Sequence, residues 1–210
     1  MKTPITLPRL RQHWTYHWWQ YALAILLSVL MVNLLFSVTE PRIPATEKLE
    51  LYVYGSVRQE EIDAWLEELR AEYFPDQRQI TVTEIIADET YGAMVISAHV
   101  AAGEGDLFLL PREIYQNFAD QGLFLALDDV FPVESLPAAE QVNLERAYRR
   151  DAETGEKHLY GVPVSAVPRL QAATSLPASA ILGARNRYSD DDRALHLLLL
   201  LLQDGNDGQN

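Results

Sequence analysis

The sequence predicts an α/β domain with a mostly parallel sheet flanked by helices, and a transmembrane helix ahead of it. Three observations support this prediction. Residues 18–38 contain no charged side chain. From residue 48 to residue 122, short apolar runs of strand length alternate with longer segments in which apolar residues recur every three or four positions. Short connections between such alternating strands and helices favour parallel strands joined by right-handed crossovers.

The N-terminal region predicts a single-pass cell-membrane protein. About 20 apolar residues cross the hydrocarbon core of a bilayer, and residues 19–38 meet this requirement. Aromatic rings, which favour the headgroup layer, crowd the start of the run at Trp14, Tyr16, Trp18, Trp19 and Tyr21. Basic residues and no acids precede the run. The positive-inside rule therefore makes residues 1–18 a cytoplasmic tail and the following domain extracellular.

A cleaved secretory signal is the alternative, and it would also export the domain. The apolar run exceeds the usual signal core of about 7 to 15 residues, and no small-residue cleavage site follows it, which favours a retained anchor. Within the run, Asn33 could hydrogen-bond to a neighbouring helix, although its own backbone or water is the simpler partner. Pro41 and Pro44 make residues 39–47 a short, stiff linker.

Charge and composition exclude several classes of function. All 30 Asp and Glu but only 14 of the 17 Lys and Arg lie beyond Thr39, which gives this part a formal charge of −16. Nucleic acid is excluded as a partner, since phosphate binding requires clustered positive charge. The chain has no cysteine and its five histidines are scattered, so we expect no metal site and no cofactor. Because common catalytic motifs are also missing, we expect no enzyme activity.

The first strand is predicted at residues 49–54, which are apolar or aromatic at nearly every position, as in a strand covered on both faces. Ser56 and Gln59 have capping-box spacing, which predicts the start of a helix. The apolar stripe of this helix consists of Ile62, Trp65, Leu66, Leu69 and Tyr73. Pro75 ends the helix, and residues 80–86 are predicted to form the second strand.

The second helix is predicted to be well buried. One face carries Tyr91, Met94, Val95, Ala98 and Ala102, and the other face is also small and apolar. Residues 106–110 are predicted to form the third strand. A third helix follows Pro111, because proline is tolerated at the first helical position. It turns Ile114, Tyr115 and Phe118 inward, and Gly122 ends it.

Beyond residue 128 the pattern is less regular. We expect a helix at residues 140–150, a hairpin turn at Thr154 and Gly155, and a strand at residues 158–164.

The C-terminal end combines a strand at residues 180–184 with a helix that starts at Ser189 and carries six consecutive leucines, residues 197–202. A helix that is apolar on every side requires burial in the domain or a covering partner, and burial is the simpler prediction. The domain is thus predicted to occupy residues 48–203, and residues 204–210 are predicted to be a disordered tail.

Five short motifs follow one another in the first part of this domain: residues 51–55 (LYVYG), 72–75 (EYFP), 101–108 (AAGEGDLF), 121–128 (QGLFLALD) and 159–163 (LYGVP). Their order resembles the extracellular solute-binding proteins of ABC transporters, especially the sugar-binding, maltose-type cluster. The resemblance implies a periplasmic-binding-protein-like lobe, a carbohydrate or another small solute as ligand, and an ABC transporter permease or another membrane protein as partner.

Two departures from that family bear on the resemblance. Only residues 167–179 stand where a second lobe would be, so the first lobe alone is expected. The lipobox cysteine is absent, and the transmembrane helix would replace it as the anchor.

In an open α/β sheet, ligands bind at the carboxyl ends of the strands. The candidate ligand-binding residues at these positions are Tyr54, Ser56, Asp88, Glu89 and Arg112. Several have a structural alternative: Tyr54 can belong to the core, Ser56 can cap a helix, and the two acids can compensate a helix dipole.

Two functional hypotheses follow. The first is a membrane-tethered extracellular solute-binding-like module that binds or docks rather than catalyses, in association with an ABC transporter. The alternative is a protein-interaction or sensory subunit of a membrane complex that kept the lobe but lost the pocket. The single lobe favours docking, because a small ligand needs burial on most sides for affinity.

Overall fold

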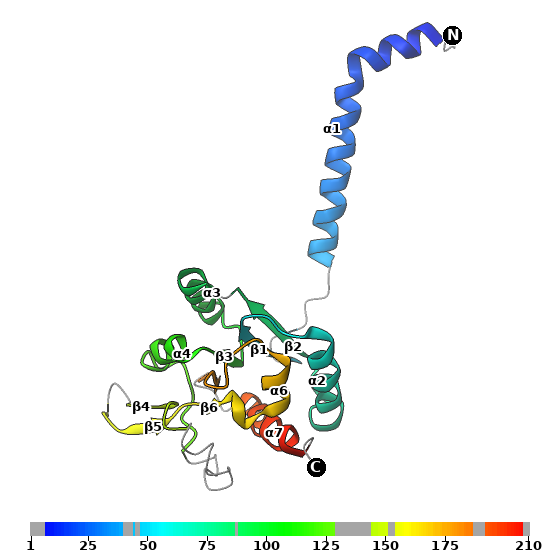
Figure 1. Ribbon diagram of the computed structural model, residues 1–210. Helices are drawn as coiled ribbons and strands as arrows, with labels where there is room; N and C mark the ends of the chain where they lie inside the picture. Colours follow the sequence, from blue (N-terminus) through cyan, green and yellow to red (C-terminus); the bar gives the residue numbers. More distant parts are fainter. Residues whose placement is uncertain are drawn as a thin grey trace. The chain divides into compact units, whose positions relative to one another are not determined.

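The computed structural model describes residues 7–39, 44, 47–86, 88–128, 144–150, 154–186 and 192–207. The chain divides into two compact units, Met1–Arg42 and Ile43–Asn210. The described part of the first unit is one helix, and the second unit, here called the lobe, is an α/β domain (Figure 1).

Helix α1 (Leu7–Thr39) is drawn in blue in Figure 1. Its stretch Trp18–Phe36 has a mean hydropathy of 1.9, and none of it is buried. A hydrocarbon core of about 30 Å is crossed by about 20 helical residues at about 1.5 Å each. By length and composition, α1 is the one helix in the described part of the chain that can cross a membrane.

A five-stranded sheet with the strand order β2-β1-β3-β7-β6 forms the centre of the lobe. Strands β1 (Lys48–Tyr54), β2 (Gln79–Ile85) and β3 (Leu107–Leu110) are parallel to one another. Strand β7 (Ile181–Ala184) runs antiparallel both to β3 and to β6 (Val162–Pro163). Only β7 is therefore reversed within this sheet, and the predicted α/β class with a mostly parallel sheet is confirmed.

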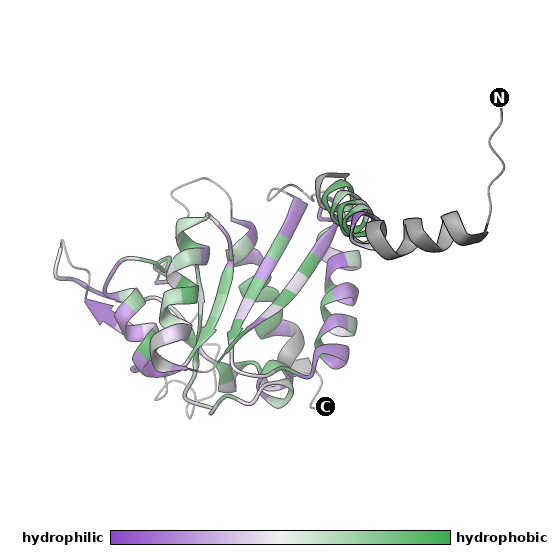
Figure 2. Cartoon of the chain, turned by 90° about the horizontal axis from the view of Figure 1, so that it is seen from above, coloured by the Kyte–Doolittle hydropathy of each residue, from purple (hydrophilic) through white to green (hydrophobic). Residues whose placement is uncertain are grey.

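Helices cover both faces of the sheet (Figure 1, Figure 2). On one face, α6 (Pro168–Ala173) contacts α2 (Gln59–Tyr73) and α7 (Arg193–Asp207). On the other lie α3 (Glu89–Ala101) and α4 (Arg112–Ala119). The steps from β1 to β2 and from β2 to β3 run in opposite directions across the sheet, so right-handed crossovers place α2 and α3 on opposite faces.

The core lies between the central strands and the helices. All residues of β3 are buried, and Leu51 of β1 pairs with Leu107 of β3. Helix α7 adds Leu197, Leu198 and Leu201, each 0% exposed, and packs near α6, β7 and the 3-10 turn η3 (Val164–Ala166). The predicted burial of the leucine-rich helix is thus confirmed. Helix α7 continues to Asp207, beyond the predicted boundary at residue 203.

The prediction that the second helix is well buried is wrong. Tyr91 and Met94, from its predicted inner face, are 48% and 61% exposed, whereas Ile96 is 0% exposed. Gly92 is also buried and faces the ring of Tyr54. Because α3 is apolar around most of its circumference, its sequence does not indicate which face packs on the sheet.

The prediction of a helix at residues 140–150 is wrong for residues 145–150. Leu144 is helical, as predicted, but residues 145–147 form a turn. Strand β4 (Tyr148–Arg150) then pairs with β5 (Lys157–Leu159) in an antiparallel hairpin. Gly155, with a φ of 72°, lies in the predicted turn. The strand predicted at residues 158–164 is divided among β5, β6 and η3. The predicted helix start at Ser189 lies outside the described residues.

Candidate functional site

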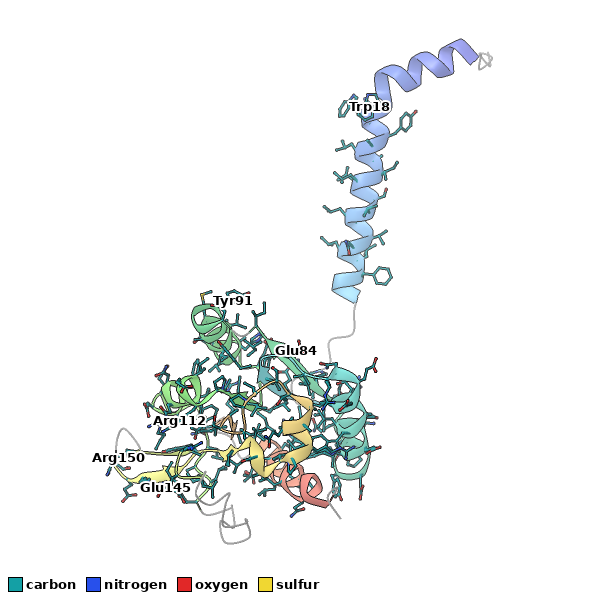
Figure 3. The ribbon with its side chains drawn as sticks, viewed as in Figure 1. Trp18, Glu84, Tyr91, Arg112, Glu145 and Arg150 are labelled. Atoms are coloured by element: carbon teal, nitrogen blue, oxygen red, sulfur yellow. The ribbon has the colours of Figure 1, made fainter. Side chains whose placement is uncertain are left out.

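The carboxyl ends of β1, β2 and β3 form one edge of the lobe, where the sequence places its candidate ligand-binding residues. Figure 3 labels three side chains that come from elements at this edge: Glu84 from β2, Tyr91 from α3 and Arg112 from α4. Arg112 is exposed at the first position of α4, immediately after the N-cap residue Pro111.

Tyr54, the last residue of β1, is a core residue with 5% exposure. Its ring lies against α3 so closely that a Cβ on Gly92 would be 2.3 Å from Tyr54 Cε2. This packing fixes the distance between α3 and the centre of the sheet. Stacking on a ligand ring would require Tyr54 to leave this position.

Ser56 belongs to a turn that a distant segment closes. The Ser56 N–H donates to Ser175 Oγ at 3.1 Å, and the Ser175 N–H donates to the Ser56 carbonyl at 3.0 Å. Val57 forms an isolated antiparallel bridge with Thr174. The Arg58 N–H continues this pairing by donating to the Ala173 carbonyl at 2.8 Å. Residues 173–175 therefore accept the backbone N–H groups of Ser56 and Arg58 after β1.

The predicted capping role of Ser56 is wrong. Helix α2 begins at Gln59 with Arg58 at the N-cap position, and no side chain caps it. The Val57 N–H donates to Glu84 Oε1 at 2.6 Å. The turn at residues 56–57 is therefore held by two side chains that are distant in the sequence, Ser175 and Glu84, and not by a capping box at the start of α2.

Asp88 caps α3, since its Oδ1 accepts the N–H of Tyr91 at 2.7 Å. Asp88 thus has a structural role of the kind given above as the alternative to ligand binding. Its carboxylate accepts a free N–H and lies near the positive end of the helix dipole. Glu89 is the first residue of α3, and its side chain lies outside the described part of the structure. Within the described residues, no group of three metal-ligating side chains occurs.

Two adjacent cavities lie between α3 and α4 and together form the α3–α4 groove. Their volumes are about 580 Å³ and about 410 Å³. They share Ser97, Phe118 and Gln121, and the larger one reaches Gly103 and Arg185 near the amino end of β3. Sequence reasoning missed this groove. The available signal was the small residues Ala93, Ser97 and Ala101 at four-residue spacing, which leave room beside α3.

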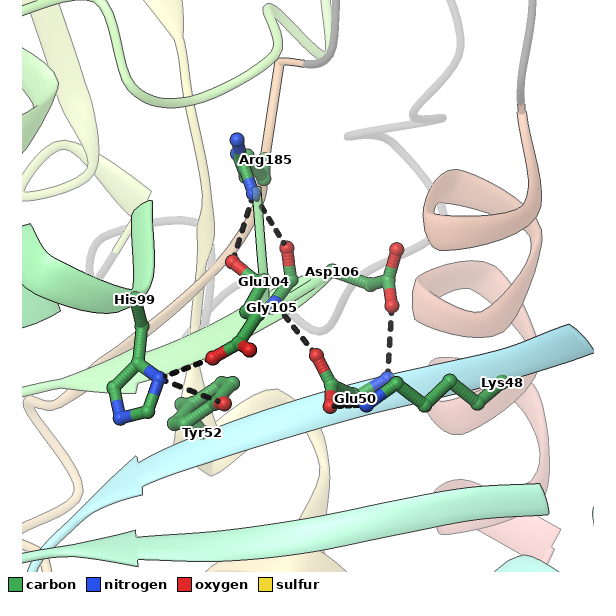
Figure 4. Close-up of polar contacts among 8 residues, drawn as sticks. All are labelled: Lys48, Glu50, Tyr52, His99, Glu104, Gly105, Asp106 and Arg185. Atoms are coloured by element: carbon green, nitrogen blue, oxygen red, sulfur yellow. Dashed lines mark hydrogen bonds and ion pairs between the residues drawn. The ribbon is translucent and has the colours of Figure 1, made fainter. Parts of the chain in front are cut away.

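A buried pair of acids organises the amino edge of the sheet (Figure 4). Glu50 and Asp106 are 8% and 2% exposed. Asp106 Oδ2 accepts the Glu50 N–H at 2.8 Å, and Glu50 Oε2 accepts the Gly105 N–H at 2.9 Å. Lys48 Nζ lies 2.5 Å from Glu50 Oε1 and compensates its charge. These contacts hold the loop of residues 103–106 against β1, which is a structural task.

Tyr52 and Glu104 both contact the ring of His99. His99 Nδ1 lies 3.2 Å from the Tyr52 hydroxyl and 2.7 Å from Glu104 Oε2. Burial raises the pKa of Tyr52 above its ordinary value, and the nearby carboxylates of Glu50, Glu104 and Asp106 raise it further. The hydroxyl is therefore neutral at physiological pH and keeps its proton for hydrogen bonding.

Arg185 closes the end of α3 at the same edge. Its Nη1 donates to the Glu104 carbonyl at 2.7 Å, and its Nη2 donates to the Val100 carbonyl at 3.1 Å. A cation near the last carbonyls satisfies free acceptors and favours the negative end of the helix. Arg185 therefore shapes one end of the α3–α4 groove while serving a structural role.

Three large apolar side chains around the start of α3 are open to solvent. Ile86, Tyr91 and Met94 are 68%, 48% and 61% exposed. We call these residues the α3 patch. Met94 also lines the α3–α4 groove, so the patch and the groove are continuous.

No family model and no curated protein matches the chain. It is similar to solved structures of solute-binding proteins. A family 1 extracellular solute-binding protein of Alicyclobacillus acidocaldarius is 19% identical with a TM-score of 0.42. The match covers 55% of this chain and 27% of the Alicyclobacillus protein. For a maltose-bound protein of T. maritima, the identity is 19%, the TM-score 0.41, and the coverage 55% and 28%. An ABC substrate-binding protein of Listeria monocytogenes in complex with cycloalternan is 21% identical with a TM-score of 0.39. This match covers 54% of this chain and 28% of the Listeria protein.

The descriptions of these structures name an extracellular solute-binding protein, a maltose-bound protein and an ABC substrate-binding protein. The chain spans less than a third of the length of each of these proteins.

Proposed function

We propose that the protein is a membrane-tethered extracellular binding module that docks a membrane partner and does not catalyse a reaction. One contrast within the lobe carries this proposal. Hydrogen bonds from residues 173–175 close the turn after β1, whereas the α3 patch and the α3–α4 groove are open. The lobe thus offers a surface rather than an enclosed cleft at its carboxyl edge.

Helix α1 is the proposed tether. The stretch Trp18–Phe36 has the length and hydropathy of a membrane span. Basic residues before it and acids after it favour a cytoplasmic N-terminus and an extracellular lobe. With a formal charge of −16 beyond Thr39, the lobe is repelled by anionic lipid headgroups, which favours binding to proteins over binding to the bilayer.

The α3 patch is the proposed docking surface. Contiguous exposed apolar side chains mark interaction sites on soluble domains, and tyrosine and methionine are enriched at interface cores. Because the tether confines the lobe to the membrane surface, its partner is a membrane protein. The permease of an ABC transporter is the partner that the family resemblance favours.

Site-directed photo-crosslinking tests this proposal. The chain has no cysteine, so a single introduced cysteine can carry a benzophenone group in the native membrane. We expect Met94→Cys and Tyr91→Cys to crosslink a discrete membrane protein. Tyr73→Cys is the matched control, since Tyr73 is a 43% exposed aromatic residue of α2, on the other helical layer. Equal crosslinking from the three positions, or none from Met94→Cys, would contradict docking through the α3 patch.

Capture of a small solute is a second candidate, favoured by the cavity of about 580 Å³ between α3 and α4. Ligand pockets typically measure about 300–1,000 Å³, and Ser97, Gln121 and Asn186 provide polar groups at its wall. Maltose and cycloalternan, named for two similar structures, are the first probes.

Thermal unfolding tests solute capture. A ligand at 100 times its Kd stabilises the folded state by about 2.7 kcal/mol, so the unfolding temperature should rise with ligand concentration. Ala101→Trp, which fills the cavity, should abolish this response. If no probe stabilises the lobe while Met94→Cys still crosslinks a partner, the lobe is an interaction or sensory subunit without a pocket.

A further inference from the structure

Asn33 places an amide inside the apolar stretch of α1. It lies about 9 Å along the helix from the midpoint of Trp18–Phe36, within the half-thickness of about 15 Å of a hydrocarbon core. Ser28 is satisfied locally, because its Oγ donates to the Ala24 carbonyl at 2.8 Å. Among the residues that the structure describes, the Asn33 carboxamide has no such partner. An amide in hydrocarbon requires one, since no water is available there.

Asn33 also lies on a regular seam of α1. Ala22, Leu26, Val29, Asn33 and Phe36 recur at alternating steps of four and three residues. This heptad spacing keeps one face of a helix turned toward a second helix. Along the seam, Leu26, Val29 and Phe36 are 62%, 59% and 73% exposed, so the face is uncovered within the described residues.

The surface of this face has a shape that suits a facing helix. A hollow of about 300 Å³ is lined by Ser28, Val29, Val32, Asn33 and Phe36. Phe36, Val29 and Val32 line the hollow together, and a large side chain next to smaller ones provides the knob and the hole that helix pairing requires. Shape and polarity therefore point to the same side of α1.

A second copy of the chain is the occupant that this geometry fits. All copies insert in the same direction, so two α1 helices run parallel, and residues of equal number lie at equal depth. Asn33 of one copy then faces Asn33 of the other. A carboxamide is both donor and acceptor, so the two side chains satisfy each other across a twofold axis.

We propose that α1 forms a parallel pair with α1 of a second copy through Asn33 and the seam around it. This inference rests on the proposed function, because α1 must span a membrane. Its consequence is a tether that carries two lobes, which raises the effective concentration of docking surfaces toward a partner with two binding sites.

Cysteine crosslinking of the full chain tests the pairing. Because the chain is free of cysteine, single variants can be reconstituted in phosphatidylcholine vesicles and oxidised. We expect Val29→Cys and Leu26→Cys to form disulfide dimers, and Leu27→Cys and Met31→Cys, on the opposite face, to form few. Equal dimer from all four positions, or dimer from none, would overturn the pairing.

Variants at Asn33 test the role of the amide in the Val29→Cys background. Asn33→Leu should reduce dimer formation about tenfold, equal to about 1.4 kcal/mol, and Asn33→Gln should retain it. The double change Asn33→Leu with Met31→Asn keeps one amide but moves it to the opposite face. In this double variant, dimer formation through Val29→Cys should fall. When the single cysteine is instead placed at Leu27, dimer formation should rise. Undiminished Val29→Cys dimer in Asn33→Leu would overturn the proposal.

Alkaline extraction of the same vesicles separates the two proposals. If the chain is released from the membrane, both the tether and the pairing fail. If the chain is retained but its crosslinking does not depend on the face or on Asn33, only the pairing fails.

Discussion

Replacing Gly105 by alanine should destabilise the lobe much more than the same change at Gly103. The two glycines share a left-handed backbone, with φ of +83° and +81°. A Cβ on Gly105 would lie 2.4 Å from Phe108 Cζ and 3.0 Å from Tyr52 Cδ2, whereas a Cβ on Gly103 meets nothing within 4 Å. Phe108 and Tyr52 are 0% and 3% exposed, so neither ring can move aside into solvent.

The expected magnitudes follow from the shared backbone conformation and from the different surroundings of the added Cβ. A left-handed alanine costs about 1–2 kcal/mol, which applies to both variants. Overpacking a buried site adds about 1–3 kcal/mol, which applies to Gly105→Ala alone. The lower entropy of the unfolded chain returns about 0.4–1 kcal/mol in each case and cancels in the comparison. We therefore expect Gly105→Ala to be less stable than Gly103→Ala by about 1–3 kcal/mol.

Urea unfolding of the lobe measures this difference. Trp65 is the only tryptophan beyond residue 42 and is 1% exposed, so its fluorescence reports unfolding. The slope of free energy against urea should be the same in both variants. If the two variants are equally stable, or Gly103→Ala is the less stable, the packing of the 103–106 loop on Tyr52 and Phe108 is wrong.

Three further predictions concern the core, the site and pH. Leu198→Ala should lower the free energy of unfolding by about 2–5 kcal/mol, because Leu198 is 0% exposed; a loss under 1 kcal/mol would mean that α7 is not a core helix. Asp88→Ala should cost about 0.5–2 kcal/mol in the same assay, since the Tyr91 N–H loses its acceptor, and Asp88→Asn should keep most of that stability. Above about pH 10, the ordinary tyrosine pKa, unfolded Tyr52 releases a proton that folded Tyr52 retains, because its folded pKa is raised. The free energy of unfolding should therefore fall as pH rises, and an equally steep fall in Tyr52→Phe would exclude this residue as the cause.

The regular elements of the first part of the lobe could be predicted because local patterns encode them. The strand at residues 49–54 and the stripe that includes Trp65 and Leu69 each repeat with the period of their element. Gly55, with φ of 130°, ends β1 where the chain turns.

The features of the candidate site depend on contacts that no local pattern encodes. The hydrogen bond from Ser56 to Ser175 joins residues 119 apart in the sequence, and it replaces the local cap that Gln59 indicates. The outward face of α3 could not be predicted either, because apolar residues surround this helix and the ring of Tyr54 selects Gly92 as the inner position. Asp88 shows the opposite case, since a cap immediately before a helix is a local feature.

Labelling of single cysteines in intact cells tests the central claim, a lobe held outside the cell by α1, most directly. One variant carries Glu113→Cys on the exposed surface of α4, and the other carries Thr3→Cys ahead of α1. With a membrane-impermeant maleimide, Glu113→Cys should be labelled in intact cells, and Thr3→Cys only after the membrane is permeabilised. Protection of Glu113→Cys in intact cells, or labelling of Thr3→Cys without permeabilisation, would contradict the account.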